Sequence, residues 1–390
     1  MNVIYVDNNA TTKVAPEVVD AMVPYFSEYY GNPSSMHSFW GNVAVIIKEA
    51  RQNLAELIGA TADEIIFTSC GTESDSTAIR AAIESNPAKR HIVTTRVEHP
   101  AIKNLYENLS KHGYRVTFIP VDNFGRLDLD YLYQHLSDDT AIVSIMWANN
   151  ETGVIFPIEE ISHEIKRRGI VFHTDAVQAI GKIPIDVNNT GVDMLSLSGH
   201  KFHAPKGIGA LYIRKGTKFS PFLIGGHQEK GRRGGTENTA AIIGLGKAAE
   251  LAIKHLRENG YERIARLRDK LENQLLQKVP NTIVNGDREH RLPNTTSIAF
   301  EYVEGEAILL MMNEHAICAS SGSACTSGSL EPSHVLRAMG VPFTAAHGSI
   351  RFSLSRYNSE DEIDFILEKL PPIIENLRAM SPFWKKAIGG

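Results

Sequence analysis

The sequence has few cysteines, no long apolar run and no cluster of basic residues, and each absence excludes a class of protein. Three cysteines occur among 390 residues, and no two of them form a CxxC pair. Neither a disulfide framework nor a structural zinc site is therefore expected. No apolar stretch approaches the roughly 20 residues that span a bilayer, so we expect no membrane association. The net charge is -5 without a run of Lys or Arg, which argues against nucleic acid as a partner.

The N-terminus lacks the pattern of a secretion signal, because residues 1–7 hold no basic region followed by an apolar core. We therefore expect a cytoplasmic protein. The composition, with 43% hydrophobic and 22% charged residues, is typical of a globular chain. A length of 390 residues exceeds what one hydrophobic core usually organises, so two domains are expected.

Short apolar runs alternate with helical stretches through the first part of the chain. The runs are mostly continuous, which is typical of strands buried on both faces of a sheet. The last run follows its neighbour too closely for a crossover helix, so we expect it to be antiparallel. The predicted strands are 65–68, 91–95, 116–119, 141–146, 170–174, 194–198 and 208–213. This alternation predicts an α/β fold with a mainly parallel central sheet.

Helical periodicity flanks this region. Residues 16–58 carry apolar side chains at helical spacing, interrupted by a loop at 31–35. A long helical region from Ala240 to about Val279 is predicted to lead into a smaller α+β C-terminal domain. That domain is expected to hold strands at 296–300 and 349–353 and a closing helix at 359–379. The predicted boundaries are 13–257 for the large domain, and 1–12 together with 258–390 for the small one.

A lysine follows the predicted strand 194–198. In Ser196–Lys201 an apolar strand ends in a small polar turn. A lysine that forms a Schiff base must be held rigidly, near polar groups that bind an anionic cofactor. Ser198 and His200 are suited to contact a phosphate. Taken alone, such a segment is more often a surface turn with an exposed lysine.

Polar residues also follow two other predicted strands. Asp175 ends an apolar run and is suited to pair with a protonated pyridine nitrogen, although a helix N-cap is an equally good interpretation. Gly71 and Thr72 begin a helix after a strand, where free N–H groups form an anion site. The alternative is an ordinary glycine turn with a threonine cap. In open α/β sheets, ligands gather at these carboxyl ends of the strands.

Two further polar residues follow strands. His99 can stack on a cofactor ring and relay protons, but a single loop histidine is more often a surface residue. Asn149 can hydrogen-bond a ring hydroxyl, or simply form an Asx turn. Each interpretation is weak alone. Five such sites at five strand ends favour a cofactor-binding enzyme.

Together these segments match one family. The chain resembles the fold-type-I pyridoxal-phosphate enzymes, and within them the NifS/IscS-like cysteine desulfurases. The resemblance covers essentially the whole chain, and the ordered series is far more specific than any one motif. The matching stretches are Asp7–Thr12, Gly31–Ser35, Gly71–Ser74, Asn149–Gly153, His173–Gln178, Ser198–Lys201, Arg233–Asn238 and Ser321–Cys325.

The resemblance implies a role for each matched residue. Lys201 is implied to bond covalently to pyridoxal 5'-phosphate, while Asp175 holds the pyridine nitrogen and His99 stacks on the ring. Arg351 is implied to clamp the substrate carboxylate, a task that suits the bidentate guanidinium. Further contacts with cofactor are implied for Gly71, Thr72, Asn149, Gln178, Ser198, Gly199 and His200, with Asn149 also near the substrate. Thr236 is implied to reach the phosphate of the neighbouring subunit, so a homodimer is expected.

Cys325 distinguishes this family from related transaminases. Residues 319–329 are almost wholly small, a composition with little packing value that allows movement. The resemblance implies that the Cys325 thiolate takes sulfur from L-cysteine as a persulfide and leaves L-alanine. It further implies delivery to a NifU- or IscU-type scaffold for iron–sulfur cluster assembly, either for nitrogen fixation or for general use. We expect no intrinsic metal, although Cys325 is compatible with a transient iron–sulfur contact.

Three other interpretations remain open from the residues alone. A pyridoxal-phosphate aminotransferase or lyase shares every cofactor residue but has no use for Cys325. A Rossmann dehydrogenase is suggested by Gly244–Ala249, yet this GxGxxA pattern lies within a helical pattern rather than after a strand. A sulfur carrier or scaffold-binding protein without catalysis is the third, against which the presence of both Lys201 and Cys325 argues.

Overall fold

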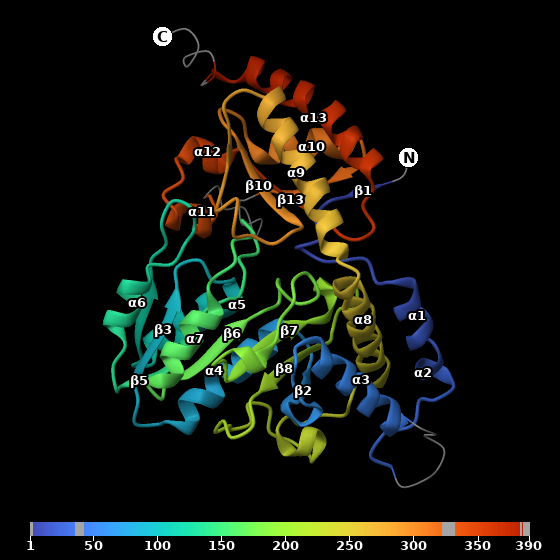
Figure 1. Ribbon diagram of the computed structural model, residues 1–390, viewed down its shortest axis with the longest axis vertical. Coiled ribbons are helices and arrows are strands. Elements are labelled where there is room, and N and C mark those ends of the chain that lie inside the picture. The colour runs from blue at the N-terminus through green and yellow to red at the C-terminus, as the bar shows by residue number, and fades with distance from the viewer. Residues whose placement is uncertain (1–2, 36–42, 322–331, 383, 385–390) are drawn as a thin grey trace.

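A seven-stranded sheet forms the centre of the larger part of the molecule (Figure 1). The computed structural model describes residues 3–35, 43–321, 332–382 and 384. The strand order is β2-β8-β7-β6-β5-β3-β4, and neighbours are parallel except where β8 pairs with β2 and β7. The strands are β2 (Ile65–Thr68), β3 (His91–Thr95), β4 (Arg115–Ile119), β5 (Thr140–Ser144), β6 (Val171–Asp175), β7 (Met194–Ser198) and β8 (Gly209–Ile213). The predicted mainly parallel sheet and its antiparallel last strand are confirmed.

Helices cover both faces of this sheet, as continuous apolar strands require. Ile66 of β2 faces a core cluster shared with α4 (Gly71–Ser85) and α5 (Pro100–Lys111). Phe67, the next residue, faces the opposite cluster. That second cluster is built with α3 (Val43–Leu57), α6 (Leu129–His135), α7 (Ile158–Arg167) and α8 (Thr239–Arg257). The result is a three-layer α/β/α arrangement whose strand ends open toward the smaller part of the chain.

Two predicted helical regions are interrupted in the structure. The region predicted to be helical from Ala240 to about Val279 consists of α8 and α9 (Gly260–Lys278). Asn259 separates them with a φ of 53°, a left-handed conformation that Asn tolerates better than most residues. The helical character of this region is confirmed, and the structure adds a break between the two helices. The region 16–58 likewise holds separate helices, α1 (Pro16–Met22), α2 (Pro24–Ser27) and α3.

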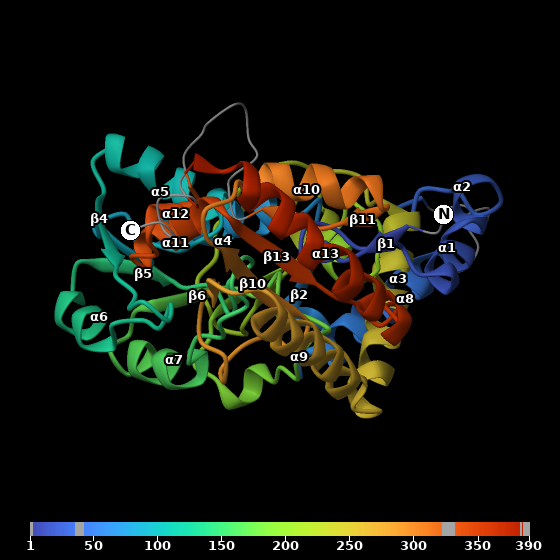
Figure 2. The same ribbon diagram turned by 90° about the horizontal axis from the view of Figure 1, so that it is seen from above.

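The smaller part is an antiparallel sheet covered by helices, shown at the top of Figure 1. Its strand order is β12-β13-β10-β9. The strands are β9 (Thr282–Val284), β10 (Thr295–Phe300), β12 (Ser320–Ser321) and β13 (Ser349–Ser353). Helices α9, α10 (Gly305–Glu314) and α13 (Glu360–Met380) contribute to its core. Figure 2 shows α9 and α13 side by side over this sheet. The predicted α+β character of the C-terminal region is confirmed.

The N-terminal strand belongs to the smaller part, although it comes first in the chain. Strand β1 (Ile4–Tyr5) pairs in parallel with β11 (Ile317–Cys318), and Val6 lies in the same core as α9. In the other direction, α11 (His334–Ala338) and α12 (Phe343–His347) place apolar side chains in the core of the larger part. The predicted domain boundaries remain a prediction. Every helix among the described residues is too short or too polar to cross a membrane.

Candidate active site

One pocket, with an empty volume of about 620 Å³, opens at the carboxyl ends of the central strands. It lies where β7, β6, β3 and β2 end and the following turns begin. Eight of the residues predicted from the sequence line it, namely Gly71, Thr72, His99, Asp175, Gln178, Ser198, His200 and Lys201. Their assignment to a cofactor remains a prediction, but the structure brings them together from four separate segments.

Lys201 ends a short 3-10 turn, Gly199–Lys201, directly after β7. Its amine donates hydrogen bonds to the carbonyls of Asn9 (2.6 Å) and Ala10 (2.8 Å). Desolvation in the pocket, aided by the charge of Arg351, lowers the pKa of Lys201 to about 8. The turn itself depends on Gly199, because a Cβ there would lie 2.9 Å from Ile208 and 3.0 Å from Ala204. Lys201 is thus held rigidly and is easily made neutral.

Asp175 is the last residue of β6 and is 5% exposed. Its Oδ1 accepts the backbone N–H of Val177 at 2.9 Å, and the residues that follow form turns rather than a helix. Asp175 is therefore not a helix N-cap; its Oδ1 stabilises the turn that follows β6. Burial raises the pKa of Asp175 to about 6, so a cationic partner in the pocket would favour its ionised form.

Two histidines face the same pocket. His99 precedes α5, and its Nδ1 accepts the N–H of Ala101 at 3.2 Å. This contact leaves the proton of the neutral ring on Nε2. Desolvation by the pocket walls, followed by the charge of Lys201, lowers the pKa of His99 to about 4. His200 has its pKa lowered to about 4 by the same two causes. Both rings are neutral hydrogen-bonding groups at neutral pH.

The start of α4 forms an anion cradle at one end of the pocket. Gly71 is its first residue, and a Cβ at this position would lie 2.9 Å from the Val177 side chain. Free N–H groups at the N-terminus of this 15-residue helix attract negative charge. The Ser198 side chain lies beside Gly71, since a Cβ on that glycine would be 3.5 Å from the Ser198 Cβ. The buried Ser198 hydroxyl has no hydrogen-bond partner among the described residues. A glycine that leaves room, a helix N-terminus and a hydroxyl without a partner all fit a bound phosphate group.

The N-terminal segment holds two residues that line the pocket, Lys201 and Gln178, a role that the sequence did not suggest. Asn9 accepts from Lys201 through its carbonyl, and the same carbonyl accepts from the Gln178 amide at 3.0 Å. Lys182 donates to the Asn9 side chain (3.0 Å) and to Gln178 Oε1 (2.7 Å). Asn9 and Lys182 therefore fix the Gln178 amide. The signal for Asn9 was the Asp7–Thr12 stretch, which matched the family without suggesting a role for any one residue, whereas Lys182 lies outside the matching stretches.

Asp75 is a third residue that sequence reasoning missed, after Asn9 and Lys182. It lies one turn into α4, lines the pocket and is 1% exposed. Its Oδ1 lies 3.6 Å from His173 Nε2. Burial, together with the nearby Asp175, raises the pKa of Asp75 well above its usual range. The only signal in the sequence was an acidic residue on the apolar face of a helix.

Among the described residues, four predicted site residues do not line this pocket, namely Gly199, Asn149, Thr236 and Arg351. Gly199 shapes the turn beneath it, as described. The Asn149 amide is 1% exposed, donates to the Val97 carbonyl and caps its own turn, whereas the neighbouring Asn150 reaches the pocket. Thr236 is exposed on a separate loop. Its expected contact with a neighbouring subunit, like the role of Asn149, stays a prediction. Cys325 lies outside the described residues.

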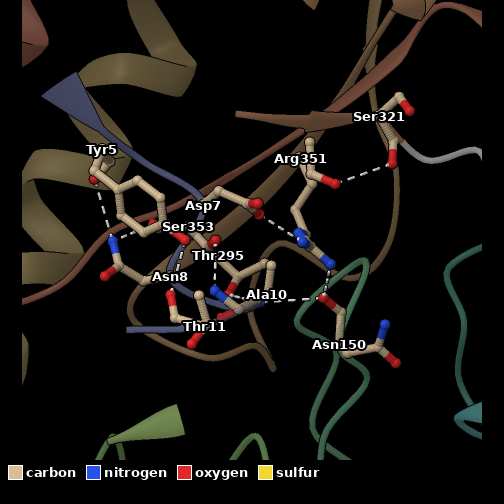
Figure 3. A network of polar contacts seen from close by, with 12 residues as sticks. Tyr5, Asp7, Asn8, Ala10, Thr11, Asn150, Thr295, Ser321, Arg351 and Ser353 are labelled. Atoms are coloured by element: carbon tan, nitrogen blue, oxygen red, sulfur yellow. Dashed lines mark hydrogen bonds and ion pairs between the residues drawn. The ribbon is translucent and has the colours of Figure 1, made fainter. Parts of the chain in front are cut away.

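Arg351 lies in β13, above the pocket. Its Nη2 donates to Asp7 at 2.7 Å, and its Nη1 donates to the carbonyl of Asn150 at 3.1 Å (Figure 3). Its Nε is buried without a partner among the described residues. Because Asn150 lines the pocket, the Arg351 guanidinium is in direct contact with a residue of the pocket wall. This placement is suited to a substrate carboxylate, the role predicted for Arg351.

Comparison with known proteins agrees with this geometry. A model of the family described as aminotransferase class-V matches residues 4–366. A cysteine desulfurase of Trichormus azollae is 61% identical over 383 residues, covering 98% of this chain and 96% of the relative. The cysteine desulfurase NifS of Azotobacter vinelandii is 59% identical over 382 residues, covering 98% and 95%. A solved NifS-like protein superposes with a TM-score of 0.90 at 38% identity, covering 96% of this chain and 100% of that chain.

The three-layer fold, the lysine-bearing pocket and the family match together define the class. The chain belongs to the aminotransferase class-V family, whose members generally depend on pyridoxal phosphate. Within that family it is a cysteine desulfurase, because relatives of this type match it over nearly its full length. The family, the fold type and the enzyme class expected from the sequence are confirmed.

Proposed function

We propose that this cysteine desulfurase binds pyridoxal 5'-phosphate in the pocket around Lys201 and moves sulfur from L-cysteine to Cys325. The observation that carries the proposal is the pocket itself. It joins an amine of lowered pKa, a buried carboxyl and an anion cradle at one site. The relatives named as cysteine desulfurases support L-cysteine as the substrate.

Each wall of the pocket suits a different part of the cofactor. Asp175 is placed to hold a protonated ring nitrogen, and Gln178 is placed near Lys201 by its bonds to Asn9 and Lys182. Asn149 remains a predicted contact of the ring hydroxyl. When bound, pyridoxal phosphate supplies an electron-withdrawing ring that stabilises negative charge on the substrate. The predicted phosphate contacts are Gly71, Thr72, Ser198, His200 and, from the second subunit of a homodimer, Thr236.

Lys201 and His99 are the proposed proton carriers. With a pKa of about 8, the Lys201 amine can accept a proton from the substrate α-carbon near neutral pH and return it. His99 presents its Nε2–H because its Nδ1 is occupied by Ala101. A neutral imidazole in this tautomer donates a hydrogen bond without adding a charge. Arg351 is proposed to hold the substrate carboxylate, replacing part of its contact with Asp7.

Sulfur transfer is proposed to occur at Cys325. Its thiolate forms an S–S bond with the substrate sulfur while the Cβ–S bond of cysteine breaks. The electron pair of the broken bond stays on the substrate carbon, and protonation of that carbon completes L-alanine. The persulfide on Cys325 is then proposed to pass its outer sulfur to a NifU- or IscU-type scaffold protein.

A product assay tests this proposal. Protein is incubated with L-cysteine and a thiol reductant, and alanine and sulfide are measured in wild type, Cys325→Ala and Cys318→Ala. We expect equal release of both products by wild type, loss of both in Cys325→Ala, and normal release in Cys318→Ala, because Cys318 lies in β11 away from the pocket. Unchanged turnover in Cys325→Ala, or alanine without sulfide in wild type, contradicts the proposal.

A further inference from the structure

The turn formed by residues 149–152 is linked to the described chain on both sides of Cys325, directly to Ser333 and through Arg351 to Ser320. The Asn149 side chain fixes this turn, because its Oδ1 accepts the N–H groups of Glu151 (2.9 Å) and Thr152 (3.0 Å). Its amide nitrogen donates to the Val97 carbonyl at 3.0 Å. The turn is therefore held firmly in place beside the pocket, which Asn150 lines.

The first link runs through Arg351 to Ser320, which precedes Cys325 in the chain. Arg351 donates to the carbonyl of Asn150 at 3.1 Å. The backbone of Arg351 pairs with Ser320 of β12, and β12 ends at Ser321. Figure 3 shows Asn150, Arg351 and Ser321 in this order, from the turn to the strand. The turn is thus linked through one side chain to the last strand before residue 322.

The second link lies on the C-terminal side. The Ser333 hydroxyl donates to the Glu151 carboxylate. The Ser333 Oγ also accepts the N–H of Val335 at 3.0 Å, so Ser333 is the N-cap of α11. His334 adds a contact between its Nε2 and the carbonyl of Glu98 at 2.9 Å. Glu98 immediately precedes His99. The start of α11 is thereby fastened to the turn and to the strand end that carries a pocket residue.

Glu151 is an unusual residue for a purely structural contact. Burial, opposed by the Ser333 hydroxyl and the charge of Arg351, raises the pKa of its carboxyl to about 7. A side chain with so large a desolvation cost is commonly placed at a functional site. No step proposed for the cofactor or the substrate uses Glu151 or Ser333.

We propose that Glu151 and Ser333 form an anchor that holds the start of α11, the first described helix after Cys325, at the 149–152 turn beside the pocket. Both are then positioning residues for sulfur transfer. The inference rests on the proposed function, since it concerns the step at Cys325. The anchor does not touch the substrate. It holds Ser333, which follows Cys325 in the chain, while pairing with β13 holds Ser320 and Ser321, which precede Cys325. Transfer between two sulfur atoms depends on their alignment, so a small displacement is enough to slow it.

A pair of variants and their double variant test this anchor in the holoenzyme. Glu151→Ala removes the carboxylate and leaves the α11 cap in place, whereas Ser333→Ala removes both the bond and the cap. Two readouts are followed, the binding of L-cysteine by absorbance of the bound cofactor and the rate of persulfide formation on Cys325 by mass spectrometry. We expect binding to stay within about twofold of wild type, and persulfide formation to slow about 10- to 100-fold.

Two controls separate positioning from stability. Ser359→Ala removes another serine N-cap, at the start of α13, and is expected to leave the persulfide rate unchanged. Glu151→Gln keeps the side-chain volume and an oxygen acceptor, so it is expected to restore most of the rate. Because Glu151 and Ser333 act through one bond, the double variant should be no slower than the slower single variant. Should Glu151→Ala fail to fold, Ser333→Ala and Glu151→Gln carry the comparison.

Three results overturn the inference. The first is persulfide formation at the wild-type rate in Glu151→Ala and Ser333→Ala. The second is a loss of cysteine binding as large as the loss of rate. The third is a double variant in which the two effects multiply. A wild-type enzyme that makes alanine without persulfide on Cys325 overturns the proposed function and this inference with it, whereas normal wild-type persulfide with unaffected variants overturns the inference alone.

Discussion

At the scale of single residues, the reactivity of Lys201 follows from its surroundings. Desolvation and the charge of Arg351 lower its pKa to about 8, and only the neutral amine is a nucleophile. We predict that the cofactor-free protein takes up pyridoxal phosphate faster as the pH rises. The rate should increase about tenfold per pH unit below about pH 8 and level off above it, since the neutral fraction is then nearly complete. Stopped-flow absorbance at a series of pH values measures this dependence.

The control for this prediction is Lys201→Arg, whose guanidinium stays charged over the whole range and should give no absorbance change from a covalent bond. A wild-type rate that still rises steeply toward about pH 10 would show that the Lys201 pKa is unshifted.

The lowered pKa of Lys201 also affects the stability of the fold. The folded state binds Lys201's proton more weakly than the unfolded state, so this residue's contribution increases with pH between the folded and unfolded pKa values.

At the scale of elements, Asn259 determines where α8 ends and α9 begins. It is exposed and adopts a φ of 53°, which a β-branched side chain adopts only at a cost. We predict that Asn259→Val lowers the free energy of unfolding by about 1–2 kcal/mol, while Asn259→Gly changes it by less than about 0.5 kcal/mol. Urea denaturation followed by circular dichroism measures both. Equal losses in the two variants would show that the Asn259 side chain, rather than its backbone conformation, matters.

The same junction shows why some elements could be predicted from the sequence and others could not. Strands β2, β3 and β7 were predicted with their observed bounds, because each is a short run that contains apolar residues and is bounded by polar turn residues. All of their residues are buried. The apolar periodicity of α8 and α9 continues across Asn259, so the left-handed conformation of Asn259, which separates the two helices, could not be predicted from it. Strands β1, β11 and β12 have two residues each, too few for any period to appear.

The candidate site divides in the same way. Asp175 ends β6, and Lys201 and His99 lie in the turns after β7 and β3. Parallel strands bring their carboxyl ends to one edge, so topology alone placed these residues together. Asn9 and Lys182 reach the pocket from an N-terminal segment and from a turn. Their positions depend on how the two parts of the molecule meet. No local pattern in the sequence records that contact, which is fixed only by the three-dimensional packing.

At the scale of the whole molecule, the position of Thr236 bears on subunit arrangement. Within one chain it is exposed and lines a different hollow, together with Phe67 and Gly207. The neighbouring Arg233 is fixed by Glu73 of α4 at 2.8 Å. A loop that is held in place but directed away from its own pocket is suited to a second subunit. The family resemblance implies that each active site is completed by Thr236 of the other chain.

Mixing two inactive variants tests this arrangement. Lys201→Ala lacks the covalent lysine, and Thr236→Ala lacks the hydroxyl expected at the partner's phosphate. In a mixed dimer, the subunit that keeps Lys201 receives Thr236 from the Lys201→Ala chain, so one complete site forms. With random pairing, half of the dimers are mixed, and about one quarter of all sites become complete. We therefore expect sulfide release to recover to about one quarter of the wild-type value when the two variants are denatured together and refolded. Each variant refolded alone is the control and should stay inactive. If Thr236 acts in its own subunit, no site regains both groups and mixing restores nothing.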